Sequence, residues 1–204
     1  PVRRLAAVLA ADMVGYSRLM EVDEAGTLAR LKTHRLELID PAIAKNRGRI
    51  IKTTGDGMLV EFHSVVDAVT CAAEVQRRMA RRNADVSPAR WIQFRIGINL
   101  GDVIIEENDI FGDGVNVAAR LEVLAEPGGI CVSGAVRDQV NHRLDDIAFE
   151  DIGEQNVKNI TRPIHVFRVR FEPDAAGAPV NGKDGATATI ATRKPSIAVL
   201  PLVN

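Results

Sequence analysis

The sequence lacks the features that mark membrane-spanning, secreted and nucleic-acid-binding proteins. No apolar run approaches the roughly 20 residues that a membrane-spanning helix needs, and no signal-peptide pattern is found. Basic and acidic side chains nearly balance, 26 against 27, whereas a general nucleic-acid binder usually carries a basic excess. These absences predict a cytoplasmic protein without a membrane segment and without affinity for nucleic-acid polymers.

Cysteine and histidine are also scarce. Cys71 and Cys131 lie far apart in apolar surroundings, which favours buried free thiols over a disulfide. The four histidines show no spacing typical of metal ligands. The composition is globular, with 46% hydrophobic residues among 204, and allows one domain with a sizeable core.

Hydrophobic periodicity predicts alternating strands and helices as far as Phe171. The expected strands are 4–11, 49–54, 58–62, 91–100, 102–106, 130–133, 148–152 and 164–171. The expected helices are about 17–45, a segment capped by Ser64, and about 112–125. Pro41 predicts a kink or break near Asp40, and the glycines around Asp56 predict a hairpin. This alternation predicts an α+β or α/β fold with a mixed sheet.

The composition changes after residue 171. Residues 172–195 are rich in Ala, Gly, Thr and Pro and lack periodicity, which predicts a linker that follows a first domain over 1–171. The apolar run at 196–204 resumes as a strand and predicts the truncated start of a downstream domain.

Two aspartates stand where predicted strands end in turns. Asp12 follows the first strand, and Asp56 lies between two glycines in the expected hairpin. Taken singly, each aspartate has the alternative of merely capping its turn. Together they predict a site for Mg²⁺, which prefers oxygen ligands. Such a pair can bridge two ions about 3.5–4 Å apart that act on an attacking oxygen and a leaving group.

A second polar set lies between residues 109 and 120. Asn116 and Arg120 are four residues apart on a predicted helix, so they share a face and can bind a sugar and a phosphate. Their alternative is a surface pair that stabilises the helix slightly. Gly112 and Gly114 permit close backbone approach, but the order G-x-G-x-x-G, a Walker loop and a calcium-binding loop are absent from this segment. The pattern points to chemistry on a nucleotide.

Five stretches of the chain carry a resemblance to one family. They are residues 11–17, 52–57, 97–101, 109–120 and 157–160. Their order and spacing are those of class III nucleotidyl cyclases, the adenylate and guanylate cyclases, whose catalytic domain the chain resembles over about 4–170. The resemblance implies an α+β fold with a ferredoxin-like βαββαβ core and a mixed, mostly antiparallel sheet flanked by helices. The end of the chain resembles the start of the TolB-like segment that follows such cyclases in some bacterial proteins.

The resemblance also implies a reaction and its residues. Asp12 and Asp56, with the backbone carbonyl of Met13, would hold two Mg²⁺ or Mn²⁺ ions per site. The ribose 3′-hydroxyl would attack the α-phosphorus, close the 3′,5′ ring and expel pyrophosphate, as in an adenylate cyclase that serves intracellular signalling. Arg120 would stabilise charge on the α-phosphate and Asn116 would orient the ribose, which is the positioning and electrostatic work that phosphoryl transfer requires.

The family positions of Lys52 and Asp109 read the base. The lysine donates to N1 of adenine and the aspartate accepts from its N6 amine, whereas guanine inverts both demands. Because sites built on such hydrogen bonds discriminate strongly, ATP is favoured over GTP. Lys158 matches a family lysine that contacts the distal phosphates, and it is the loosest match. Asn99 departs from the histidine of many relatives and has no catalytic role assigned.

Family cyclases take the metal aspartates from one chain and the remaining site residues from the other. This chain carries both sets, so a symmetric homodimer would have two equivalent sites. Lys52 and Asp56 would then serve different sites, although they are only four residues apart. Two alternatives stay open, namely a non-catalytic nucleotide-binding or dimerisation module and a guanylate cyclase. A diguanylate cyclase is excluded because its Gly-Gly-(Asp/Glu)-(Asp/Glu)-Phe turn is absent.

Overall fold

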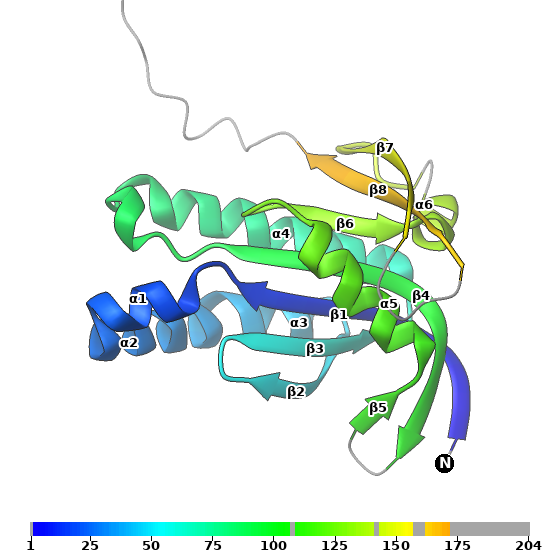
Figure 1. The fold of residues 1–204 in the computed structure, drawn as a ribbon, viewed down its shortest axis with the longest axis horizontal. Helices are drawn as coiled ribbons and strands as arrows, with labels where there is room; N and C mark the ends of the chain where they lie inside the picture. Colours follow the sequence, from blue (N-terminus) through cyan, green and yellow to red (C-terminus); the bar gives the residue numbers. More distant parts are fainter. Residues whose placement is uncertain (1, 107–108, 141–142, 157–161, 172–204) are drawn as a thin grey trace, which may run out of the picture.

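The computed structural model of the chain describes residues 2–106, 109–140, 143–156 and 162–171 (Figure 1). The strands are β1 (Val2–Met13), β2 (Arg49–Thr54), β3 (Gly57–Phe62), β4 (Phe94–Glu106), β5 (Asp109–Phe111), β6 (Ile130–Ser133), β7 (Ile147–Gln155) and β8 (Ile164–Phe171). The helices are α1 (Tyr16–Val22), α2 (Glu24–His34), the π-helical η1 (Arg35–Ile39), α3 (Asp40–Lys45), α4 (Val65–Ala84), the 3-10 turn η2 (Pro88–Arg90), α5 (Asp113–Leu124) and α6 (Gly134–Val140). The expected linker and downstream segment lie outside the described residues.

The strands form one eight-stranded sheet in the order β2-β3-β1-β4-β6-β8-β7, with β5 paired to β4. Among the described strands the β4–β6 pair is parallel and every other pair is antiparallel. The α+β class and the mixed, mostly antiparallel sheet are therefore confirmed. No helix of the described residues is long and apolar enough to cross a membrane.

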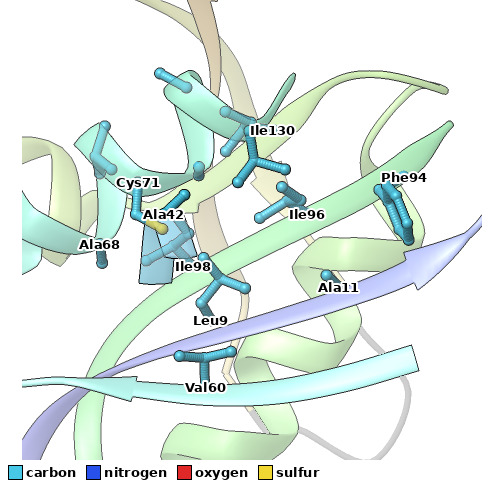
Figure 2. Packing of buried hydrophobic residues seen from close by; sticks show 14 of the residues in the cluster. Leu9, Ala11, Ala42, Val60, Ala68, Cys71, Phe94, Ile96, Ile98 and Ile130 are labelled. Carbon is cyan, nitrogen blue, oxygen red and sulfur yellow. The ribbon is translucent and has the colours of Figure 1, made fainter. Parts of the chain in front are cut away.

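Strand alternation divides the sheet into two faces, because successive side chains point to opposite sides. On the first face Leu9 pairs with Val60 and Ile98, and these side chains are buried in the main core (Figure 2). Helices α3, α4 and α6 contribute to this core, including Cys71 of α4. Burial raises the pKa of the Cys71 thiol to about 12. Both cysteines are free and buried, as predicted.

The second face is covered by α5, which lies over β4 and β1 (Figure 1). Two glycines of β4 make this close packing feasible. A Cβ on Gly97 would come within 2.2 Å of both the carbonyl oxygen of Ala118 and the nitrogen of Glu122. A Cβ on Gly101 would lie 2.9 Å from the Cα of Gly114. Glycine at these positions therefore lets the backbone of α5 rest directly on the sheet.

Several elements differ from the sequence prediction. Near Asp40, where a kink or break is expected, the chain stays helical without a break but changes helix type, because it passes from α2 through the π-helical turn η1 into α3. There Pro41 occupies the first turn and needs no N–H partner. The break lies earlier, at Asp23, whose carboxylate accepts a hydrogen bond from the Gly26 N–H. The strands expected at 91–100 and 102–106 are one strand, β4, since antiparallel pairing with β1 continues through Gly101. Helix α6 was not predicted.

Candidate active site

Asp12 and Asp56 lie next to each other at one end of the sheet. Asp12 is near the end of β1, and Asp56 lies in the two-residue turn between β2 and β3, where Gly55 has a φ of 63°. β1 and β3 are antiparallel neighbours, so the end of the first strand meets the start of the other. A Cβ on Gly57 would lie 3.2 Å from Oδ1 of Asp12. The hairpin thus carries the second carboxylate close to the first.

The two carboxylates repel each other. Burial raises the pKa of Asp12 first, and the charge of Asp56 raises it further, while the Met13 N–H and Arg95 act in the opposite direction. A half-buried carboxylate whose pKa is raised by burial and by a second carboxylate nearby suits a divalent cation, which prefers oxygen donors and removes the repulsion. Among the described residues no group of three or more acidic, histidine or cysteine side chains could hold a metal ion. Further ligands would therefore come from the backbone, the substrate or water.

Two charged residues near Asp12 were not foreseen from the sequence. Arg95 of β4 is the direct cross-strand partner of Asp12, and Glu122 of α5 interacts electrostatically with Asp12, Asp56 and Arg95. Burial, followed by the charge of Asp12, raises the pKa of Glu122 to about 7. The available signal was a charged residue inside an apolar pattern, since Arg95 stands between buried Phe94 and Ile96. Only the strand pairing shows what it faces.

Lys52 and Asp109 form the second charged pair. Lys52 Nζ donates a hydrogen bond to Oδ2 of Asp109 over 2.8 Å, and it lies 5.5 Å from the ring centroid of Phe111. Asp109 Oδ1 accepts from the Ile110 N–H at 2.8 Å. The hydrogen bond from Lys52 holds the pKa of Asp109 below its usual value. Lys52 thus pairs with a residue 57 positions away and makes no ion pair with Asp56.

A β-bulge turns Lys52 toward Asp109. Ile50 pairs with Val60 on the core face, but the register shifts after it and Lys52 pairs with Leu59 on the opposite face. In a regular strand Lys52, two residues after Ile50, would share the core face with Ile50. The strand is anchored just before the bulge, where the fully buried carboxylate of Glu61 accepts hydrogen bonds from Arg49 at 2.8 and 3.2 Å. Arg4 of β1 also contacts this carboxylate at 2.5 Å.

Asn116 and Arg120 lie on the flank of α5 that faces away from the sheet. Asn116 is exposed and Arg120 is half-buried. Within the described part of the chain, neither side chain makes a hydrogen bond or an ion pair, so neither is joined to Asp12 or Asp56. The N-terminus of α5 is held by buried Asn99, whose Nδ2 donates to the Gly114 carbonyl oxygen at 3.1 Å. Lys158 lies outside the described residues.

Comparison with known proteins identifies the family. The sequence model of the adenylate and guanylate cyclase catalytic domain matches residues 4–169. The chain belongs to this family. It is 49% identical over 208 residues to putative adenylate cyclase 3 of Rhizobium meliloti, covering 99% of this chain and 34% of that protein. The chain thus spans about a third of the length of that relative.

Solved cyclase structures share the fold. The crystal structure of an adenylate/guanylate cyclase/hydrolase from Silicibacter pomeroyi is 55% identical, with a TM-score of 0.77, and covers 86% of this chain and all of that one. The adenylyl cyclase CyaB of P. aeruginosa is 26% identical, with a TM-score of 0.70, over 84% of this chain and 96% of that one. The class III cyclase fold that the sequence motifs imply is confirmed. The expected TolB-like segment lies beyond the matched cyclase domain and stays a prediction.

Proposed function

We propose that this cyclase domain is an adenylate cyclase that converts ATP to 3′,5′-cyclic AMP and pyrophosphate. The observation that carries the proposal is the presence of two complete charged pairs on one chain. Asp12 and Asp56 form an acidic pair suited to divalent cations, and Lys52 and Asp109 form a donor–acceptor pair suited to adenine.

The acidic pair would hold two Mg²⁺ or Mn²⁺ ions, with the Met13 carbonyl as a further ligand. When bound, the ions lower the pKa of the ribose 3′-hydroxyl and neutralise charge on the triphosphate. The chain's own contribution is rigidity, since Asp12 is fixed in β1 and Asp56 in a two-residue turn. In the reaction the 3′-oxygen forms a bond to the α-phosphorus as the bond to pyrophosphate breaks.

Lys52 and Asp109, the two residues proposed to read the base, are hydrogen-bonded to each other. Lys52 Nζ has donors left for the adenine N1, and the second oxygen of Asp109 can accept from the N6 amine. Guanine presents a donor at N1 and an acceptor at O6. Its N1–H would meet the Lys52 ammonium, which is also a donor, and its O6 would meet the Asp109 carboxylate, which is also an acceptor. Such a mismatch leaves buried polar groups unpaired, which disfavours GTP.

The positions of Asn116 and Arg120 favour a shared site in a homodimer. Both lie on the outward flank of α5, with no described partner in their own chain. We propose that they complete the metal-binding half of a second copy, where Arg120 stabilises charge on the α-phosphate and Asn116 orients the ribose. Lys158 would contact the distal phosphates. A C₂ dimer then contains two equivalent sites.

The first experiment measures cyclic nucleotide production from ATP or GTP, each with Mg²⁺ or Mn²⁺, over a range of protein concentrations. The proposal expects metal-dependent cyclic AMP, little cyclic GMP, and activity that rises faster than linearly while dimers are incompletely formed. Cyclic GMP as the main product would overturn the base assignment and leave the cyclase reaction intact. If a dimer that binds ATP makes no product, the domain is a regulatory module.

Mixed variants test the shared site. Asp56→Ala and Arg120→Ala are each expected to be inactive as homodimers, because each lacks one half of both sites. When mixed and allowed to exchange, heterodimers hold one intact site, so about a quarter of the wild-type activity should return. Mixing Asp56→Ala with Asp12→Ala is the matched control and should recover nothing, because both changes affect the same half. A first mixture that stays inactive despite subunit exchange contradicts the shared site.

A further inference from the structure

Glu122 is a carboxylate that the proposed reaction leaves without a role. It lies in the last turn of α5, and its backbone nitrogen sits directly over Gly97 of β4. Arg95 lies two residues before Gly97 and therefore on the same face of the sheet. Asp12 is the cross-strand partner of Arg95 on that face. Glu122 is thus held, by backbone contact, beside the strand ends that carry the metal-binding half of the site.

The surroundings of Glu122 oppose its negative charge. Asp12 of β1 and Asp56 of the β2–β3 turn repel it, burial removes part of its hydration, and Arg95 is the one facing cation among the described residues. Its position in the last turn of α5 also places it near the negative end of the helix dipole. No described donor forms a hydrogen bond or ion pair with it. A glutamine would pack in the same space without this cost.

An ionised Glu122 beside Asp12 and Asp56 costs stability, and a cation bound at this site would offset that cost. With Glu122 ionised, three carboxylates face one guanidinium. Arg95 stands opposite Asp12, and its Nε is buried without a hydrogen-bond partner. The Arg95 guanidinium is attracted to Glu122 of α5 as well as to Asp12, so the two attractions oppose each other. The arrangement keeps Asp12 available and the site strongly negative.

We propose that Glu122 is a positioning residue of the metal centre, which acts through Arg95 and its own charge to keep Asp12 and Asp56 able to bind divalent cations. The proposal rests on the metal-binding role assigned to these aspartates above. It also gives α5 two functions in one dimer. Glu122 interacts electrostatically with the metal-binding half of its own chain, whereas Arg120, two residues earlier, lies on the opposite flank that would serve the partner.

The test compares Mn²⁺ binding by wild type and Glu122→Gln, measured by electron paramagnetic resonance of free Mn²⁺ in the absence of nucleotide. Removal of an outer-shell group of a metal site typically weakens affinity by 10–100-fold, so we expect the dissociation constant of Glu122→Gln to rise about tenfold. The Mn²⁺ concentration for half-maximal cyclase activity should rise by a similar factor, with a smaller change at saturating metal. Glu122→Asp should recover part of the affinity. Asp138→Asn on α6 removes one exposed carboxylate far from these residues and should not change either value.

Thermal unfolding of the metal-free protein at pH 8 provides the second measurement. Glu122→Gln removes repulsion from Asp12 and Asp56, so its Tm should be a few degrees higher than that of wild type. Saturating Mn²⁺ should raise the wild-type Tm more than that of the variant. A lower metal-free Tm would show that Glu122 stabilises the fold and would overturn the proposal. Unchanged Mn²⁺ affinity in the variant, or no Mn²⁺ binding by wild type, would also overturn it.

These outcomes separate the inference from the proposed function. If wild type makes cyclic AMP and Glu122→Gln binds Mn²⁺ as wild type does, the role of Glu122 is wrong and the cyclase assignment stands. If wild type makes no cyclic nucleotide but Mn²⁺ affinity falls in Glu122→Gln, the metal-site inference stands and the reaction is wrong.

Discussion

The side of this cyclase domain proposed to bind metal and the side proposed to bind the base carry their charges in opposite ways. Burial and then the like charge of Asp56 raise the pKa of Asp12, so ionised Asp12 lowers the stability of the metal-free protein above its ordinary pKa. Lys52 and Asp109 are opposite charges that lower the pKa of Asp109, so its stabilising contribution persists at neutral pH and is lost only as pH falls through that lowered value.

This difference matches the ligand proposed for each side. A cation needs negative charge that is not fully neutralised, so the proposed metal side would carry a cost in stability when no ion is bound. A neutral base needs a fixed donor and a fixed acceptor, and the ion pair holds both in place at little cost. The Asp12–Asp56 side would thus be neutralised only by its ligand, whereas Lys52 and Asp109 already neutralise each other.

The largest expected effect comes from breaking the metal side. Asp56→Asn removes a proposed metal ligand, so kcat/KM should fall by about a thousandfold, equivalent to about 4 kcal/mol. The metal-free protein should be as stable as wild type or more so, because the change removes a like charge. Steady-state kinetics and thermal unfolding without metal measure the two effects. Activity within tenfold of wild type would contradict the role of Asp56.

An intermediate effect is expected on the base side. Lys52→Ala removes the proposed adenine donor, so the preference for ATP over GTP should fall by about a hundredfold. Stability should change by less than about 1 kcal/mol, because the side chains of Lys52 and Asp109 are 42% and 35% exposed. The ratio of kcat/KM for the two nucleotides measures this effect.

A double-mutant cycle sharpens the same prediction. If Lys52 and Asp109 read the base together, Lys52→Ala and Asp109→Ala should combine less than additively in nucleotide preference. Additive effects would mean that the two residues act on the base independently, despite their 2.8 Å hydrogen bond.

The smallest effect is expected from the ring beside the lysine. Phe111→Leu removes the aromatic face that lies 5.5 Å from Lys52 Nζ and keeps an apolar side chain. Exposed cation–π contacts contribute about 0.5–1 kcal/mol, so KM for ATP should rise about threefold with kcat nearly unchanged. A larger fall in kcat would show that Phe111 affects more than the position of Lys52.

Much of this architecture could be predicted from local sequence patterns. The Ser64 cap accepts a hydrogen bond from the Asp67 N–H, α5 begins and ends within a residue of its prediction, and a hairpin brackets Asp56. Each depends on residues that are close in sequence, where capping, periodicity and turn preferences act. Errors arose where distant pairing overrode the local signal, as in β4, which continues through Gly101 because β1 pairs along its length.

Short segments of the chain were enough to identify the residues of the cyclase motifs, namely Asp12, Asp56, Lys52, Asp109 and the Asn116–Arg120 pair. Which partners these residues face depends on how the strands and helices pack. Sheet order places β3 beside β1, the bulge turns Lys52 to Asp109, and α5 brings Glu122 over β4 toward Arg95. Electrostatic interactions depend on distance in space, and periodicity along the chain carries no information about partners that the sheet brings together.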